Sequence, residues 1–234
     1  MAYNKKKTAG WEAGAMPFIG DYFPIWNELG EPERRRLEQN AVYRSVPCGT
    51  ALSEGEDDCV GLIVVHAGRL RACILSDEGR EITLYRLFEG DVCLFSASCI
   101  LTDLQVDIRI EAEVDTSFWV IPAGVYQALA AESVKLSGFT SSLMATRFSE
   151  VMWRMDQILF QRFDQRLAAF LLDESAVEGT DELEITHERI ARHMGSAREV
   201  VTRMLKYFQS EGLVTLSRGG VALTDRKRLR ALAK

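Results

Sequence analysis

The stretch ITHERIARHMGSAREVVTRMLKYFQSEGLV, residues 185–214, predicts two helices joined by a sharp turn. Thr186 can cap a first helix that runs through Met194, and Ser196 can cap a second from Ala197 to about Ser210. Gly195 lies between them, where the turn needs a residue that tolerates left-handed φ. Apolar residues that can pack between the two helices are Ile190, Met194, Val201, Met204 and Leu205. This spacing is typical of a helix-turn-helix.

Polar side chains outside this packing gather near the start of the second helix. We expect them to contact DNA, and they are Ser196, Arg198, Glu199, Thr202 and Arg203. Arginine can donate two hydrogen bonds to guanine, and a carboxylate can accept one from the cytosine amino group. The alternative is a capping box, in which Glu199 only binds a backbone N–H at the helix start and the charged face is simply solvated.

The residues that follow extend the motif. The stretch GLVTLSRGGVALT predicts two short strands around Arg218-Gly219-Gly220, a wing, and Thr224 can cap a last basic helix beginning at Asp225. Residues 185–234 contain 11 Lys and Arg against 4 Asp and Glu, whereas the rest of the chain has 17 against 30. A basic C-terminal segment in an otherwise acidic chain favours a protein that binds a polyanion through that segment alone.

The composition of the whole chain limits its size class, its location and the state of its cysteines. The 234 residues are 47% hydrophobic and 26% charged, which is ordinary for a folded protein of one or two domains. The chain has no apolar run approaching the roughly 18 residues that span a bilayer, so we expect a cytoplasmic protein without a membrane partner. The odd number of cysteines favours reduced thiols over disulfides.

The segment from about Arg44 to Ile121 predicts strands. GLIVVHAGRLRACIL and REITLYRLF flank the turn signal Asp77-Glu78-Gly79, and VDIRIEAEV alternates apolar and polar residues before SFWVI. Short strands at this spacing indicate an antiparallel roll. With the helices that follow Pro122, the expected fold class is α+β.

A long helix is predicted over 133–163, a stretch without proline. Its apolar residues recur at alternating steps of four and three, and they are Met144, Phe148, Val151, Met155 and Ile158. Such a stripe is typical of a dimer seam between two copies of the helix. The alternative is an amphipathic helix that lies on its own domain.

The whole pattern resembles the Crp/Fnr family of transcription regulators, through GSAREVVTRMLKYFQSEGLV, the glycine-punctuated strands ending FEGDVCLF and the helix between them. The resemblance implies an effector-sensing, cyclic-nucleotide-binding-like β-roll with N-terminal helices (1–132), a dimerisation helix (133–163) and a winged helix-turn-helix (164–234). It also implies a homodimer on an inverted repeat of double-stranded DNA, with RNA polymerase as a further candidate partner. Arg198, Glu199 and Arg203 match the family's base-reading positions and favour a half-site resembling TGTGA, while Thr202 replaces a small residue.

The family's known sensor chemistries can be tested against single residues. Cyclic-nucleotide binders carry Gly-Glu after the GD turn and a later Arg-Ser, where this chain has Leu94-Phe95 and Val106-Asp107, so cyclic AMP is not expected. Residues 1–47 contain no cysteine, which argues against an Fnr-type iron–sulfur cluster. Ser96 replaces the histidine of the haem-binding carbon monoxide sensors, although His66 leaves other haem geometries open.

The effector and cofactor therefore stay unknown. A small-molecule pocket or a redox switch is expected around Cys93, Leu94, Phe95 and Cys99, with buried cysteines as plain hydrophobes the alternative. A metal-dependent cupin enzyme would need clustered histidines or carboxylates, and no metal site or catalytic set is predicted. Two rival functions remain. The chain could be a constitutive DNA-binding protein with a vestigial roll, or a β-roll binding module whose C-terminal tail contacts only other proteins.

Overall fold

A computed structural model describes residues 16–53, 60–76, 79–94, 96 and 108–234. Within it the chain forms two compact units, which are treated separately. The roll unit comprises Ala15–Gly79 and Thr83–Met152, and the C-terminal unit comprises Trp153–Lys234 together with Arg80–Ile82. The expected α+β class is confirmed, with the sheets of the roll preceding the long helix and the C-terminal helices.

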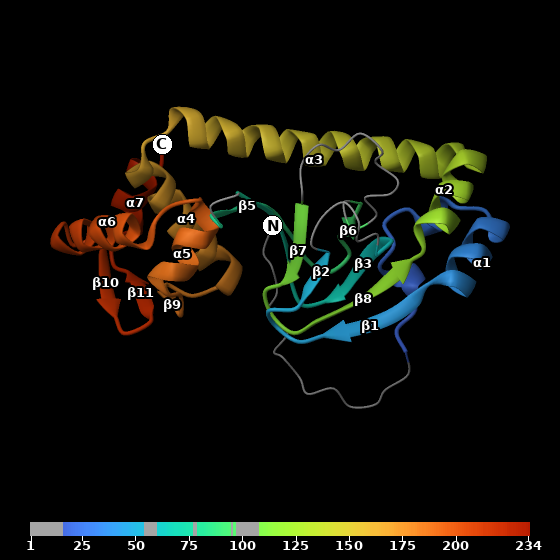
Figure 1. Ribbon diagram of the computed structural model, residues 1–234, viewed down its shortest axis with the longest axis horizontal. Coiled ribbons are helices and arrows are strands. Elements are labelled where there is room, and N and C mark those ends of the chain that lie inside the picture. Colours follow the sequence, from blue (N-terminus) through green and yellow to red (C-terminus); the bar gives the residue numbers. More distant parts are fainter. Residues whose placement is uncertain (1–15, 54–59, 77–78, 95, 97–107) are drawn as a thin grey trace. The chain divides into compact units, whose positions relative to one another are not determined.

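Two four-stranded sheets build the roll, and every strand pair with a described register is antiparallel, as predicted (Figure 1). The first sheet runs in the order β1 (Val42–Val46), β8 (Thr116–Ile121), β3 (Leu62–Ala67) and β6 (Val92–Cys93). The second runs in the order β2 (Ala51–Ser53), β7 (Ile108–Ala112), β4 (Leu70–Leu75) and β5 (Glu81–Leu87). The roll interior therefore lies between two sheet faces.

Successive side chains of β7 alternate between the two faces of the second sheet. Ile108 and Ile110 are buried in the hydrophobic core of the roll. Glu111 alternates to the other face, where its carboxylate pairs with the Arg71 guanidinium at 2.7 Å. Arg71 is almost wholly buried, and a buried charge is tolerated only when such a partner compensates for its lost hydration.

Helices flank the sheets. Near the N-terminus lie η1 (Ile19–Asp21), η2 (Trp26–Glu28) and α1 (Glu31–Asn40), and after the sheets come α2 (Ala123–Glu132) and α3 (Val134–Phe160). Pro122 is the N-cap of α2, so the helix begins directly after it, as expected. The long helix predicted over 133–163 is confirmed as α3, and it ends three residues earlier. Among the described residues, no helix is long and apolar enough to cross a membrane.

The C-terminal unit has its own core and a small sheet. Its elements are α4 (Phe163–Glu178), β9 (Glu182–Leu183), α5 (His187–Met194), α6 (Arg198–Ser210), β10 (Val214–Ser217), β11 (Gly220–Leu223) and α7 (Arg226–Leu232). The wing is confirmed as the antiparallel pair β10 and β11, with Gly219 at φ +83° in the turn. Strand β9, which pairs with β11, was not predicted from the sequence. Asp225, and not Thr224, caps α7 by accepting from the Arg228 N–H.

Candidate DNA interface

The helix-turn-helix forms as the sequence predicts. Thr186 caps α5, its hydroxyl accepting from the Arg189 backbone N–H at 3.2 Å. Gly195 ends α5 in the left-handed region at φ +63°, a conformation that costs a side-chain-bearing residue about 1–2 kcal/mol. The predicted apolar contact is also confirmed, with Ile190 and Met194 of α5 in one core with Val201 and Leu205 of α6, and Met204 partly buried against them.

The start of α6 differs from the expectation by one residue. Ala197 is the N-cap, and no side chain caps this helix. Ser196 instead belongs to the turn, where its backbone N–H donates to the Ala191 carbonyl at 3.1 Å. The capping-box interpretation of Glu199 is therefore wrong, because its carboxylate is exposed rather than bound at the helix start.

Burial divides α6 into two faces. Val201, Leu205 and Phe208 are buried in the core of the C-terminal unit. The opposite face carries a surface hollow, and the described residues that line it are Arg198, Glu199, Thr202, Arg203 and Lys206. We call these five residues the α6 face. Its two arginines, glutamate and lysine are exposed, and Thr202 is half buried.

Two members of this site were not predicted from the sequence. Lys206 lies one helical turn after Thr202 on the same face, a spacing that could have identified it. His187, the first residue of α5, binds Thr202 through an Nδ1–Oγ1 contact of 2.9 Å. Burial, followed by the positive charges of Arg198 and Lys206, lowers the pKa of the His187 imidazole. The neutral ring is therefore favoured beside these two cations.

The candidate effector residues are only partly described, since Phe95 and Cys99 lie outside the described residues. Cys93 and Leu94 are both buried, but they belong to different cores: Cys93 packs between the sheets and Leu94 packs with the flanking helices. The two side chains therefore do not line one cavity together.

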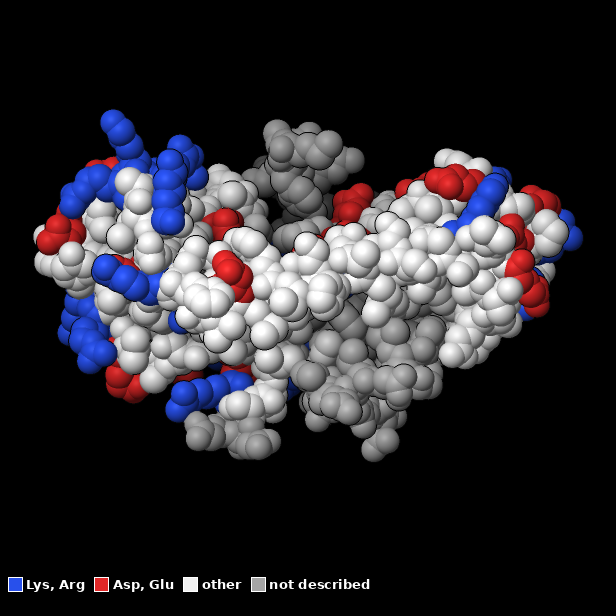
Figure 2. Space-filling view, turned by 90° about the horizontal axis from the view of Figure 1, so that it is seen from above, with Lys and Arg blue, Asp and Glu red and all other residues white. Residues whose placement is uncertain are grey.

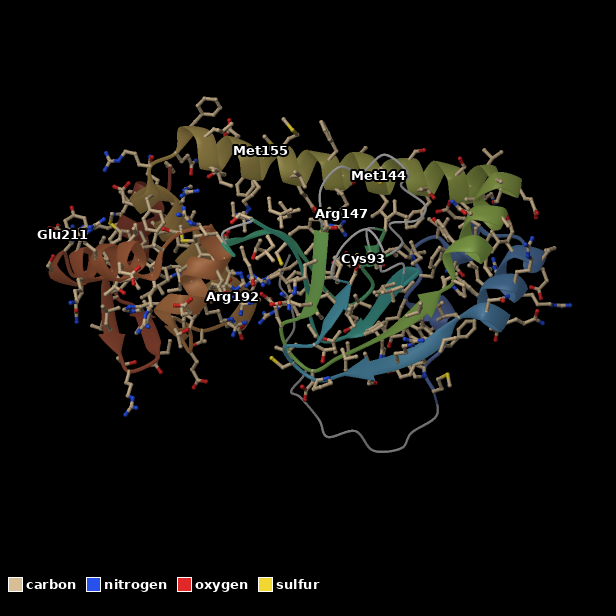
Figure 3. All side chains as sticks on the ribbon, in the orientation of Figure 1. Cys93, Met144, Arg147, Met155, Arg192 and Glu211 are labelled. Atoms are coloured by element: carbon tan, nitrogen blue, oxygen red, sulfur yellow. The ribbon has the colours of Figure 1, made fainter. Side chains whose placement is uncertain are left out.

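Tyr85 links the Cys93 region to α3. The Arg147 guanidinium lies 4.6 Å from the centre of the Tyr85 ring and donates to Glu150 at 2.8 Å, and Figure 3 shows Arg147 extending from α3. Burial, above all, raises the pKa of the Tyr85 phenol well above its usual value, and Cys93 adds to this effect. The buried, neutral phenol of Tyr85 thus interacts both with the Cys93 thiol and with a cation supplied by the long helix.

The positions considered for haem have structural roles in the roll. The Ser96 hydroxyl contacts the Gly61 carbonyl oxygen at 2.7 Å and the Cys93 carbonyl oxygen at 2.9 Å. Nδ1 of His66 lies 2.7 Å from the Tyr43 hydroxyl, and burial lowers the pKa of the ring. Within the described ranges, His, Cys, Asp and Glu form no group of three or more that could hold a metal ion.

The predicted seam on α3 divides between two faces. Met144 and Val151 pack against cores of the roll unit, whereas Phe148, Met155 and Ile158 are exposed. A second stripe with the same four-and-three spacing is exposed at every position, and it consists of Val134, Gly138, Ser141, Ala145, Phe148, Met152, Met155 and Leu159. We call it the α3 stripe. It contains no charged residue, and Figure 2 shows a largely uncharged band along this helix.

Comparisons with known proteins agree on one family. Residues 165–232 match the Crp-like helix-turn-helix domain. A crystal structure from Eubacterium rectale, assigned to the Crp/Fnr family of transcriptional regulators, is 52% identical with a TM-score of 0.89, covering 91% of this chain and 99% of that one. The cyclic AMP receptor protein of Thermus thermophilus is 27% identical, covering 90% of this chain and 96% of the relative. The fumarate and nitrate reduction regulatory protein of Yersinia pestis is 26% identical, with 88% and 84% covered.

Proposed function

Because the chain belongs to the Crp/Fnr family of transcription regulators and carries its DNA-binding helix-turn-helix, we propose that it binds an inverted-repeat operator as an effector-responsive homodimer. The observation that carries this proposal is the α6 face. Its charged side chains are exposed at the start of a helix whose other side is buried. A helix presented in this way can enter the major groove with its N-terminal residues toward the bases.

The base-reading roles follow from hydrogen-bonding chemistry. Arg198 and Arg203 would donate to guanine O6 and N7, and Glu199 would accept from a cytosine amino group. This set favours a half-site resembling TGTGA. Ser196 lies in the turn just before α6, where its hydroxyl can donate to a phosphate and position the helix without reading sequence.

The homodimer would form through the α3 stripe. Exposure along it is large for apolar side chains, at 90% for Val134, 68% for Phe148 and 66% for Leu159. Alternating steps of four and three are the spacing with which two helices pack side by side. The small residues Gly138, Ser141 and Ala145 follow Val134 in the first half of the stripe, and the second half contains only large residues. The closest helix approach is therefore expected near Gly138 and Ala145.

The effector signal would pass from the roll to α3 through Arg147. This guanidinium contacts Tyr85 of the roll while its own backbone belongs to the proposed dimer helix. A ligand or oxidant that alters the Tyr85 and Cys93 region would change this contact and so bias the dimer. A coupling of about 1–3 kcal/mol is enough for a regulatory switch.

Selection of bound sequences from a random duplex pool tests the proposal. We expect an inverted repeat with half-sites about 34 Å apart, one turn of DNA, and affinity that falls steeply as salt rises. Arg203→Ala should alter selection at one base pair per half-site, whereas Arg35→Ala, an exposed arginine of α1, should not. Failure to enrich any sequence would refute operator recognition. Equal operator affinity for the purified protein and for the protein in cell extract would favour a constitutive regulator instead.

A further inference from the structure

The contact between His187 and Thr202 joins the two helices of the helix-turn-helix beside the α6 face. Nδ1 of His187 is 2.9 Å from the hydroxyl of Thr202, a residue expected to contact DNA. The hydroxyl of threonine can both donate and accept. It can therefore stay bonded to Nδ1 whether the imidazole is neutral or protonated, and in the protonated ring Nε2–H remains as a second donor.

The charges around this ring oppose its protonation in the free protein. The positive charges of Arg198 and Lys206, both on α6, lower the pKa of the His187 ring, whereas Thr202 carries no charge. On α5 itself, the charged residues Glu188 and Arg189 follow His187. Groups that repel an imidazolium are also groups that attract a phosphate. A DNA phosphate near Arg198 and Lys206 would reverse the local balance, since it would neutralise their repulsion and favour the protonated ring.

We propose that His187 is a further DNA-contacting residue, positioned by Thr202, whose imidazolium donates Nε2–H to a backbone phosphate so that operator binding takes up a proton. This inference rests on the proposed DNA function. Thr202 is in consequence a positioning residue rather than a base reader. The histidine contact adds affinity without reading sequence, since phosphates carry no base information.

The direction of the pH effect follows from linkage. The pKa of His187 lies below its ordinary value in the free protein and would lie higher in the complex. The complex then holds more protons, so affinity falls as pH rises through the pKa of the complex. Each unit by which DNA raises this pKa adds up to about tenfold in affinity at low pH relative to high pH.

Operator affinity of the full chain, measured between about pH 6 and about pH 8 at constant salt, tests this inference over the range in which histidine titrates. The wild type should lose several-fold in affinity across this range, and His187→Gln should lose most of that dependence while keeping the same preferred sequence. His187→Lys, with a permanent charge, should bind tightly at both ends of the range. His66→Gln, in the roll, is the matched control and should keep the wild-type slope.

Thr202 supplies the test of positioning. Thr202→Val keeps the shape of the side chain but removes the hydroxyl, and it should flatten the pH slope, which Thr202→Ser should restore. Histidine NMR signals should also report a higher pKa for His187 in the complex than in the free protein. An unchanged slope in His187→Gln, or an equal His187 pKa in both states, would overturn this inference alone. Absence of any operator binding by the wild type would instead overturn the proposed function.

Discussion

Phe148→Ala tests the α3 stripe most sharply. The side chain is 68% exposed in the single chain. Full burial of a phenylalanine stabilises by roughly 1.5–3 kcal/mol, so covering this exposed fraction contributes about 1–2 kcal/mol in each protomer and about 2–4 kcal/mol in the dimer. At 1.4 kcal/mol per factor of ten, the substitution should raise the dimer dissociation constant by about 30-fold to 700-fold.

Sedimentation equilibrium over a dilution series measures this constant directly, and Met144→Ala is the matched control. Met144 was expected in the same seam, but its side chain packs against the core of the roll unit. Met144→Ala should therefore lower the melting temperature and leave the dimer constant nearly unchanged. A dimer weakened by Met144→Ala but not by Phe148→Ala would refute the α3 stripe as the dimer surface.

Three further substitutions test the C-terminal unit. Leu205→Ala should lower the free energy of unfolding of this unit by about 2–5 kcal/mol in urea, because the residue is fully buried in its core and the change leaves a cavity. A loss of less than about 0.5 kcal/mol would contradict this packing. Gly195→Ala should cost more than about 1–2 kcal/mol in the same assay, since alanine must adopt the positive φ of the turn and its Cβ would also clash with the Ile82 side chain. Arg203→Ala should weaken binding to the best operator by about 1–3 kcal/mol in a fluorescence titration, and an equal loss on random DNA would mean that Arg203 contacts only the backbone.

The helix-turn-helix could be predicted closely because its signals are local. Gly195 is needed for its backbone conformation, and Thr186 is a good cap placed before an amphipathic helix. The errors at Ser196 and Thr224 have a common cause. In each case a neighbouring residue takes the cap position, and sequence alone does not fix a helix end to better than one or two residues.

The register of the long helix could not be predicted because α3 is apolar on two sides. Met144 and Val151 face the roll unit, and Met152 and Leu159 are exposed, yet both sets recur with almost the same period. Periodicity shows that a helix has an apolar face but does not say what covers it. Strand β9 was not predicted for a different reason, since a strand of two residues is too short to show alternation of apolar and polar side chains.

The effector site was harder to predict than the DNA interface. Cys93 and Leu94 are adjacent in sequence, but Cys93 ends β6 while Leu94 follows it in a bend, and the two side chains enter different cores. The contribution of Arg147 comes from a helix more than fifty residues further along the chain. Such a long-range contact has no local signature in sequence.

The stoichiometry of the protein–DNA complex tests the central claim most directly. Native mass spectrometry of the chain on its selected duplex should show two chains on one inverted repeat, and Phe148→Ala should shift the same duplex toward one chain or none at low concentration. A single wild-type chain bound tightly and specifically to one half-site, with no second chain recruited by the intact repeat, would contradict the account.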